Sequence, residues 1–234
     1  MEITPIAHFK SPFSSKFGIP KQSGLAKDLP GRIVFEPAYR NADALRGLEG
    51  FTHLWMIWQF SANAHKANSP VVRPPVLGGN EALGVFATRS PYRPNPIGLS
   101  CVRIDHIDLD TKEGPVIHVL GADLMDGTPL FDIKPYLPYA DCHPEATGGF
   151  TDTRSWPRLE VQLAESVRKQ LTEQEAATLA DILALDPRPH YQKDPNRIYG
   201  MPYGKWDVKF RVADGEVQVV GISTTNEKKG KKLS

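Results

Sequence analysis

The sequence is poor in cysteine, in long apolar runs and in net charge. It has only two cysteines, Cys101 and Cys142, which stand far apart without any Cys-x-x-Cys pair, so neither a disulfide framework nor a zinc knuckle is expected. No apolar run reaches the ~18 residues that a membrane-spanning helix needs, and the N-terminal stretch lacks the apolar core of a signal peptide. We therefore expect a cytoplasmic protein without membrane contact.

Familiar nucleotide-binding and hydrolase signatures are missing as well. No Gly-x-Gly-x-x-Gly turn follows a first strand, Gly78-Gly79 does not lead to the Lys-Ser or Lys-Thr of a phosphate loop, and no Gly-x-Ser-x-Gly elbow is present. Asn95-Pro96 matches the start of the (Asn/Asp)-Pro-Pro-(Tyr/Phe) loop of amino-group methyltransferases on Rossmann-like sheets, but Ile97 and Gly98 follow. A doubly wound sheet is therefore not the predicted architecture.

The formal net charge of +1 hides an uneven distribution. Residues 187–234 contain ten Lys and Arg against five Asp and Glu, a net charge of +5, so the rest of the chain carries −4. A basic end on an acidic body favours a polyanionic partner. The alternative is a solvated lysine tail, at Lys228 to Lys232, that only improves solubility.

Proline is abundant, with 21 in 234 residues against a usual share of about 5 %. Prolines favour short strands and braced loops over long helices. Strand candidates accordingly follow one another at residues 3–9, 32–39, 53–60, 83–89, 98–110 and 115–124. Many short strands without interleaved long helices indicate a barrel or a sandwich.

Two of these candidate strands allow finer predictions. Residues 53–60 (HLWMIWQF) are apolar enough for a strand that is buried on both faces. Residues 98–110 lose their alternation once, which predicts a β-bulge. The core face of that second strand is then expected to consist of Val102, Ile104, Ile107 and Leu109.

The pattern changes near Trp156 toward a small α+β unit. A strand candidate at 158–165 precedes a capping box of Thr172 and Glu175, which predicts a helix that ends before Asp186-Pro187. One face of that helix is expected to carry Ala176, Leu179, Ala180 and Leu183.

Residues 206–222 predict a β-hairpin. Trp206, Val208, Phe210 and Val212 alternate with polar residues, and Asp214-Gly215 suits a type I′ turn.

The segment RSPYRPNPIG (89–98) combines two arginines and an asparagine with three prolines. Because proline fixes φ, the side chains of such a loop are held in place before any ligand binds. Arg89 and Arg93 suit a carboxylate or phosphate, and Asn95 suits an adenine edge or an amide. The alternative is a braced barrel corner whose arginines form surface ion pairs.

A second cluster of charge lies at residues 121–141, where Asp123, Asp126 and Asp132 precede Lys134. Carboxylates at this density bind a metal, act as a base or pair with cations, and the spacing does not fit a calcium loop. We expect an ion-paired cluster with Arg89, Arg93 and Lys134, or a network that only fixes the turn. No metal is expected, because His143 beside Cys142 has no second ligand pair nearby.

Four segments together resemble the TsaA-like family of tRNA methyltransferases. They are VRPPVLGGN (72–80), GVFATR (84–89), RSPYRPNPIGLS (89–100) and DLMDGTPLFDIKPYLP (123–138), while DPRPHY (186–191) resembles the longer bacterial branch with an extra C-terminal domain. The resemblance implies methyl transfer from S-adenosylmethionine to the exocyclic amine of N(6)-threonylcarbamoyladenosine, just 3′ of the anticodon. It also implies a small β-barrel that binds the cofactor near a homodimer interface.

The fold class expected from the strand pattern and the resemblance is mainly β, with an N-terminal β-barrel and a smaller α+β C-terminal domain. Residues 1–150 are expected to bind the cofactor and catalyse the reaction, and residues 151–234 to bind tRNA.

Position by position, the resemblance implies a cofactor site made of Ser23, Gly24, Leu25, Ala62, Asn63, Arg89, Leu99, Gly121, Ala122, Asp123 and Leu124. For catalysis, Asp123 or Asp126 would accept the hydrogen of the target amine, and Arg93 or Lys134 would bind the substrate carboxylate. The rival hypothesis is a non-catalytic RNA- or nucleotide-binding barrel. A metal hydrolase that uses the aspartates is a third possibility, but it lacks a histidine set.

Overall fold

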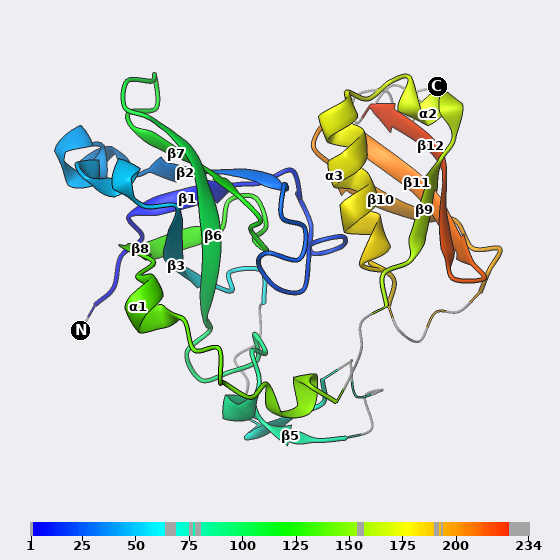
Figure 1. The fold of residues 1–234 in the computed structure, drawn as a ribbon, viewed down its shortest axis with the longest axis horizontal. Helices are drawn as coiled ribbons and strands as arrows, with labels where there is room; N and C mark the ends of the chain where they lie inside the picture. The colour runs from blue at the N-terminus through cyan, green and yellow to red at the C-terminus, as the bar shows by residue number, and fades with distance from the viewer. Residues whose placement is uncertain are drawn as a thin grey trace.

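The computed structural model describes residues 2–63, 69–74, 77, 81–153, 157–189, 192 and 194–224. Within them the chain forms a closed six-stranded barrel, a four-stranded sheet and a two-stranded ribbon. Figure 1 shows the barrel and the four-stranded sheet side by side. The basic tail at Lys228 to Lys232 and Lys193 lie outside the described residues. None of the described helices is both long and apolar enough to cross a membrane.

The barrel confirms the predicted mainly-β fold. Its strands are β1 (Ala7–Lys10), β2 (Pro30–Phe35), β3 (His53–Gln59), β6 (Ile97–Asp108), β7 (Val116–Leu120) and β8 (Pro129–Pro135), in the spatial order β1-β2-β7-β6-β3-β8. All neighbours are antiparallel, and the pairing of β1 with β8 closes the barrel. The ribbon pairs β4 (Val71–Val72) with β5 (Leu83–Gly84).

Short helices connect these strands. The 3-10 turns are Pro37–Tyr39, Ala42–Leu45, Leu48–Gly50, Val85–Ala87 and Gly149–Thr151, and α1 spans Pro138–Asp141. The turn at Ala42 is capped by Asn41, whose side chain accepts the backbone N–H of Asp43. Asparagine is one of the residue types that favour this capping position, because its side-chain oxygen can accept a free backbone N–H.

The prediction that residues 53–60 are buried on both faces is wrong. In β3, Leu54, Met56 and Trp58 are buried, while the alternate residues are only half-buried. A single-layer barrel has one interior, so only one face of each strand can enter it. The apolar residues on the outer face are partly covered by loops, as where the Trp55 indole donates to the Asp141 carboxylate over 3.0 Å.

The predicted bulge in the long strand is confirmed, but its core face is shorter than expected. The register of β6 against β7 shifts between Ile104 and His106. Val102 is buried and Ile107 half-buried, whereas Leu109 lies beyond the strand and is 56% exposed. Pairing with β7 ends at Asp108, so Leu109 has no neighbouring strand to hold it against the core.

The strand predicted at 83–89 is also largely wrong. Only Leu83 and Gly84 pair, and the chain then turns at Val85–Ala87. Thr88 closes this turn, because both its backbone N–H and its hydroxyl donate to the Val85 carbonyl. The strand β8 was not foreseen at all.

The second sheet has the order β10-β11-β12-β9, with β9 (Glu160–Leu163) parallel to β12 (Glu216–Thr224). β10 (Tyr199–Tyr203) and β11 (Trp206–Ala213) are antiparallel neighbours. The predicted hairpin is confirmed, since Asp214 and Gly215 have φ values of 52° and 80°, as a type I′ turn requires.

The predicted helix is confirmed as α3 (Glu173–Ala184), which follows the short α2 (Glu165–Arg168). Both hydrogen bonds of the capping box of Thr172 and Glu175 are present. Leu179 and Leu183 are fully buried in one core with Val208 and Phe210 of the second sheet.

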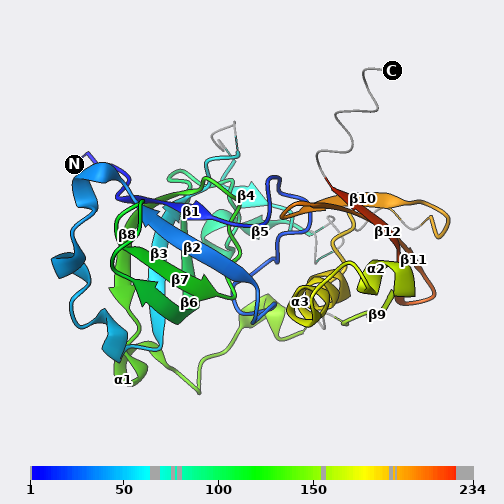
Figure 2. The ribbon, with the colours of Figure 1, turned by 90° about the horizontal axis from the view of Figure 1, so that it is seen from above.

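The segment between β1 and β2, residues 11–29, joins the two halves of the molecule. Phe13, Ala26 and Leu29 are buried in the core of the second sheet rather than in the barrel core. Phe17 stacks on Phe210, with ring centroids 6.4 Å apart. In Figures 1 and 2 this blue segment reaches from the barrel to α3 and β10. The segment therefore belongs to the barrel half in sequence but packs into the separate apolar core of the second sheet.

The packing of Gly98 generates a prediction about stability. Gly98 is paired with Trp58, and a Cβ there would lie less than 3.0 Å from the indole ring. We expect Gly98→Ala to lower the Tm by about 2 to 10 °C, because overpacking costs about 1–3 kcal/mol in a chain of this size. Gly221→Ala is the matched control, since Gly221 also lies in a strand but has open space around it. Thermal unfolding followed by circular dichroism checks this, and equal Tm values for the two variants would contradict it.

Candidate functional site

The candidate site is centred on the turn that follows β7. Gly121 has a φ of 85° and redirects the chain, so that Asp123 comes to lie against β6. A residue with a Cβ is strained at such a φ, which explains a glycine at this position. Asp123 is half-buried, while its neighbours Ala122 and Leu124 are buried in the barrel core.

A chain of hydrogen bonds anchors the Asp123 carboxylate. The buried Ser100 hydroxyl donates to Asp123 Oδ1 over 2.6 Å, and the Trp58 indole N–H donates to that hydroxyl oxygen over 3.0 Å. Burial raises the pKa of the Asp123 carboxyl, against the opposing effects of the Ser100 hydrogen bond and the nearby Arg89 charge. The site therefore holds a carboxyl group that takes up a proton more readily than an ordinary aspartate.

The loop of residues 22–25 lies against this carboxylate. The Gly24 N–H donates to the Gly121 carbonyl over 2.8 Å, and the backbone of Ser23 hydrogen-bonds to the Asp123 carboxylate. Gly24 has a φ of 81°, so its conformation also favours glycine. We call residues 22–25 the N-terminal site loop.

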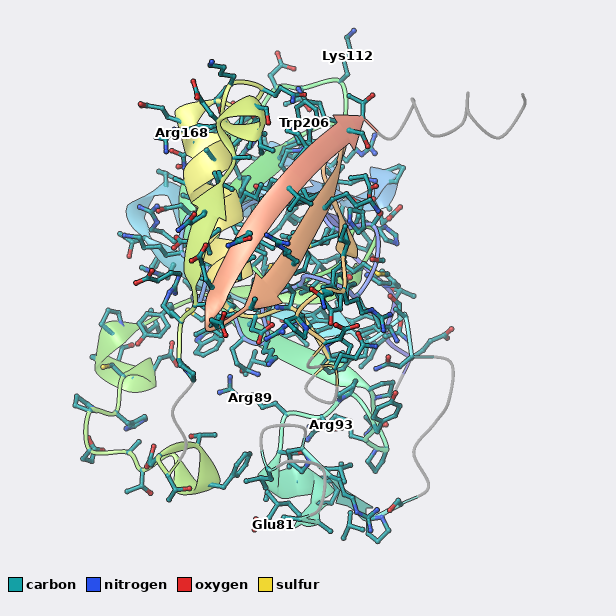
Figure 3. The ribbon with its side chains drawn as sticks, turned by 90° about the vertical axis from the view of Figure 1, so that its right-hand side faces the viewer. Glu81, Arg89, Arg93, Lys112, Arg168 and Trp206 are labelled. Carbon is teal, nitrogen blue, oxygen red and sulfur yellow. The ribbon has the colours of Figure 1, made fainter. Side chains whose placement is uncertain are left out.

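Arg89 completes this group from the proline-rich segment. Its guanidinium donates to the Gln22 side-chain oxygen over 2.6 Å, and its charge acts on Asp123. Figure 3 shows Arg89 and Arg93 on one segment below the second sheet in that view. The structure thus brings Ser23, Gly24, Arg89, Gly121 and Asp123 together, although they come from three separate parts of the sequence.

Four further residues of the expected cofactor site differ in what surrounds them. Leu25 and Leu99 expose 43% and 55% of their surface, so two apolar side chains are left uncovered there. Ala62 and Asn63 follow β3, whose end is joined to the proline-rich segment by the Phe60 N–H and the Pro96 carbonyl. Asn63 accepts a hydrogen bond from Lys16.

Three expected catalytic residues have their described contacts elsewhere. Asp126 accepts the Ser11 N–H over 3.1 Å, and Arg93 donates to the Thr88 carbonyl within its own loop. Lys134 pairs with Asp132 over 3.0 Å and lines a separate cavity of about 280 Å³ with Leu45 and Phe51. The expected ion-paired cluster is therefore reduced, among the described contacts, to the Asp132–Lys134 pair and the effect of Arg89 on Asp123.

Ser100 and Trp58 are site residues that the sequence analysis missed. Trp58 is a buried core residue, but its indole N–H also donates to the Ser100 hydroxyl that binds Asp123. Ser100 stands at a core-facing position of a strand, where a hydroxyl needs a hydrogen-bond partner. A polar residue at such a position is the sequence signal that identifies it.

Within the described residues, one group offers ligand atoms close enough for a metal ion. His106, Asp108 and His118 place one ligand atom each within 4.8 Å of the others. The two imidazoles stack with centroids 4.0 Å apart and an interplanar angle of 14°. The lone pair of an imidazole nitrogen lies in the plane of its ring. In two stacked rings these planes are nearly parallel, so the two lone pairs do not converge on one ion. The group is better described as two histidines that share the Asp108 carboxylate.

Comparison with known proteins places both halves of the chain in one family. Residues 8–142 match the tRNA-methyltransferase O N-terminal domain, and residues 156–225 match the TrmO C-terminal domain. A tRNA (adenine(37)-N6)-methyltransferase of Escherichia coli (strain K12) is 38% identical over 225 residues, which are 93% of this chain and 95% of that protein.

Two further similarities cover most of the chain. A Pseudomonas aeruginosa protein that is named, provisionally, as an S-adenosylmethionine-dependent methyltransferase is 40% identical over 214 residues, 88% of this chain and 89% of that protein. The crystal structure of TrmO from P. aeruginosa superposes with a TM-score of 0.78 at 33% identity, and covers 96% of this chain and 97% of that one.

The raised pKa of Asp123 generates a prediction with a definite sign. An acid with a raised pKa in the folded state binds its proton more tightly there than in the unfolded chain, so its stabilising contribution is present below pH 3.8 and is lost as the pH rises through the folded pKa. We expect Asp123→Asn to raise the Tm at pH 7.5, and this gain to shrink as the pH falls toward 3.8.

Calorimetry between pH 4 and pH 8 measures this difference. Asp110→Asn, at an exposed carboxylate just beyond β6, is the control for a general charge effect. A Tm difference that stays constant with pH for Asp123→Asn would contradict the expectation.

Proposed function

The chain belongs to the tRNA-methyltransferase O family, and on that premise we propose that it transfers a methyl group from S-adenosylmethionine to N6 of adenine 37 in tRNA. The observation that carries this proposal is the match of both family domains in sequence order over nearly the whole chain. It favours an enzyme over a non-catalytic RNA-binding barrel, because the full-length Escherichia coli relative is named for this reaction.

The group around Asp123 suits the cofactor chemically. S-adenosylmethionine carries a sulfonium and an ammonium group next to a carboxylate, so a site for it needs both acceptors and donors. The Asp123 carboxylate supplies an acceptor, and the Arg89 guanidinium, which has N–H groups besides the Nη1 that donates to Gln22, supplies donors. We propose that these residues hold the cofactor, with Leu25, Ala62, Asn63 and Leu99 at its edges. Ala122 and Leu124 would contribute by anchoring the turn that carries Asp123, since their side chains are buried in the barrel core.

The bound cofactor supplies an electrophilic methyl group, and the leaving sulfur departs without charge. The chain therefore has to orient the amine and accept its proton, and orientation supplies a large part of the barrier reduction. Asp123 suits the role of acceptor because its pKa is raised and so lies nearer to neutral pH than that of an ordinary aspartate, which favours proton transfer. Asp126 is the second candidate for this role, and Arg93 or Lys134 would bind the carboxylate of a threonylcarbamoyl group on the base.

We further propose that residues 1–150 bind the cofactor and catalyse the reaction, and that residues 151–234 bind tRNA. On β11, Lys209 and Arg211 alternate with the buried Val208 and Phe210, so both cations lie on the outer face of the second sheet. Lys205 lies over the Trp206 ring at the start of the same strand. Cations in a row on one face suit a phosphate backbone.

A cytoplasmic homodimer is also proposed. Tyr92, Ile97 and Leu99 are exposed apolar residues on and just after the proline-rich segment, with 39 to 55% of their surface accessible. Exposed apolar residues next to a site indicate a partner surface, and a second copy would cover them.

The role of the proline-rich segment can be tested by mild substitutions. Arg89→Lys keeps the charge but loses the planar fork, so we expect the Kd for S-adenosylmethionine to rise about tenfold. Arg93→Lys is expected to leave that Kd unchanged and to raise the KM for tRNA. Calorimetric titration measures the Kd, and methylation assays on threonylcarbamoyl-adenosine tRNA measure the KM. The control is Arg46→Lys, because Arg46 is distant in sequence from the proline-rich segment and forms an exposed ion pair. If both variants have a lower Tm than the parent but methylate tRNA at the parental rate, the segment has only a structural role.

The basic face of the second sheet gives a separate prediction. Lys209→Glu with Arg211→Glu should weaken tRNA binding, and should make the slope of log K against log salt shallower by about 1 to 2. The matched control reverses Arg46 and Lys112, which changes the net charge equally but on the barrel side. Filter binding at several salt concentrations measures the slope. If both double variants give equal slopes, the hairpin does not bind tRNA and has only a structural role.

A further inference from the structure

The segment of residues 11–29 has two sides with different partners. One side packs into the second sheet, where Phe13 and Tyr203 have ring centroids 5.9 Å apart. The backbone is pressed close as well, since the Gly204 N–H donates to the Pro12 carbonyl over 2.7 Å. The other side carries the N-terminal site loop. The position of that loop therefore depends in part on contacts with residues that follow position 150.

Gly18 is a point of close approach between the segment and the second sheet. Its φ is 94°, and a Cβ there would lie less than 3.0 Å from the Met201 sulfur. Met201 is fully buried in β10, so its side chain has little room to move away. The segment just before the N-terminal site loop thus fits the second sheet only with glycine at this position.

Arg158 holds the loop from the other end. One guanidinium nitrogen, Nη1, donates to the Leu25 carbonyl over 3.2 Å. The other, Nη2, donates to the Asp181 carboxylate on α3 over 2.7 Å. A single planar group therefore ties α3 to the last residue of the N-terminal site loop, a geometry that lysine cannot reproduce.

The opposite side of the loop meets the candidate cofactor residues. The Gly24 N–H is bound to Gly121, and the Ser23 backbone is bound to Asp123. These contacts and the Arg158 contact fall on consecutive residues, 23 to 25. A displacement of Leu25 consequently shifts the groups that face Asp123.

We propose that Arg158 is a positioning residue for the cofactor site: by holding the Leu25 carbonyl against α3, it keeps the N-terminal site loop in its binding conformation. The inference rests on the proposed function, because it takes this loop to be part of the S-adenosylmethionine site. A loop held in advance loses less conformational freedom when the ligand binds, so affinity for the cofactor depends on a contact from the C-terminal half.

The test is calorimetric titration of full-length protein with S-adenosylmethionine. Arg158→Ala is expected to raise the Kd about three- to tenfold, the range that one lost hydrogen bond of this kind produces. Arg158→Lys should lie between the parent and the alanine variant. In methylation assays the KM for S-adenosylmethionine should rise in parallel while kcat at saturating cofactor stays within about twofold. Arg168→Ala, an exposed arginine of α2 labelled in Figure 3, should keep the parental Kd.

A second pair of variants tests the same inference if Arg158→Ala folds poorly. Gly18→Ala and Gly47→Ala replace glycines with nearly equal φ values, 94° and 91°, but only Gly18 faces Met201, while Gly47 has open space. Gly18→Ala should therefore raise the Kd for the cofactor more than Gly47→Ala does, beyond the backbone strain that both share.

The outcomes separate this inference from the proposed site. If Arg89→Lys raises the Kd while Arg158→Ala and Gly18→Ala leave it within twofold of their controls, the positioning role is wrong and the cofactor site stands. If none of the three variants changes the Kd, the cofactor site itself is wrong, and the positioning role falls with it. A lower Tm for Arg158→Ala without any change in Kd would make the contact merely structural.

Discussion

The burial of one short segment against the second sheet is the constraint on which the rest of the structure depends. Phe13, Ala26 and Leu29 belong in sequence to the barrel half, yet they complete the apolar core of α3 and the second sheet. Without them that sheet would leave one part of its apolar face uncovered, which a small unit cannot easily tolerate. The two halves are therefore not independent bodies on a linker, and the loop that meets Asp123 takes its shape from both.

Asp123 shows the second constraint, which acts in the opposite direction. Burying an ionisable carboxyl group next to a barrel core costs stability, and the hydrogen bonds from Ser100 and Ser23 offset only part of that cost, because the pKa stays raised. A residue with that cost and no gain in packing is typical of a functional site rather than of a structural network. The same reasoning separates Asp123 from Asp132, whose exposed pair with Lys134 adds little to stability and sits beside a different cavity.

Features set by local sequence were predictable, whereas those set by the closure of the barrel were not. The capping box at Thr172 and the turn at Asp214-Gly215 depend on a few neighbouring residues, and both appear where the sequence places them. The single buried face of β3 depends on which strands lie on either side, so the apolar run HLWMIWQF could not reveal it. The same limit applies to the site: the motifs identified Arg89 and Asp123, but Ser100 and Arg158 act through partners 23 and 133 residues away in the chain.

The contacts of the proline-rich segment fit both of the roles that the sequence left as alternatives. Arg93 donates to the carbonyl of Thr88, the residue just before the segment, and so braces it, while Arg89 donates to Gln22 and acts on Asp123. Bracing and binding are therefore compatible, because an arginine side chain keeps a fixed position before a ligand arrives only if its own loop is stiff. The prolines stiffen this loop from within, whereas the N-terminal site loop, with its glycine at position 24, has no such internal support. It depends on contacts from outside, which come from Arg89, Gly121 and Asp123 on the barrel side and from Arg158 in the C-terminal half.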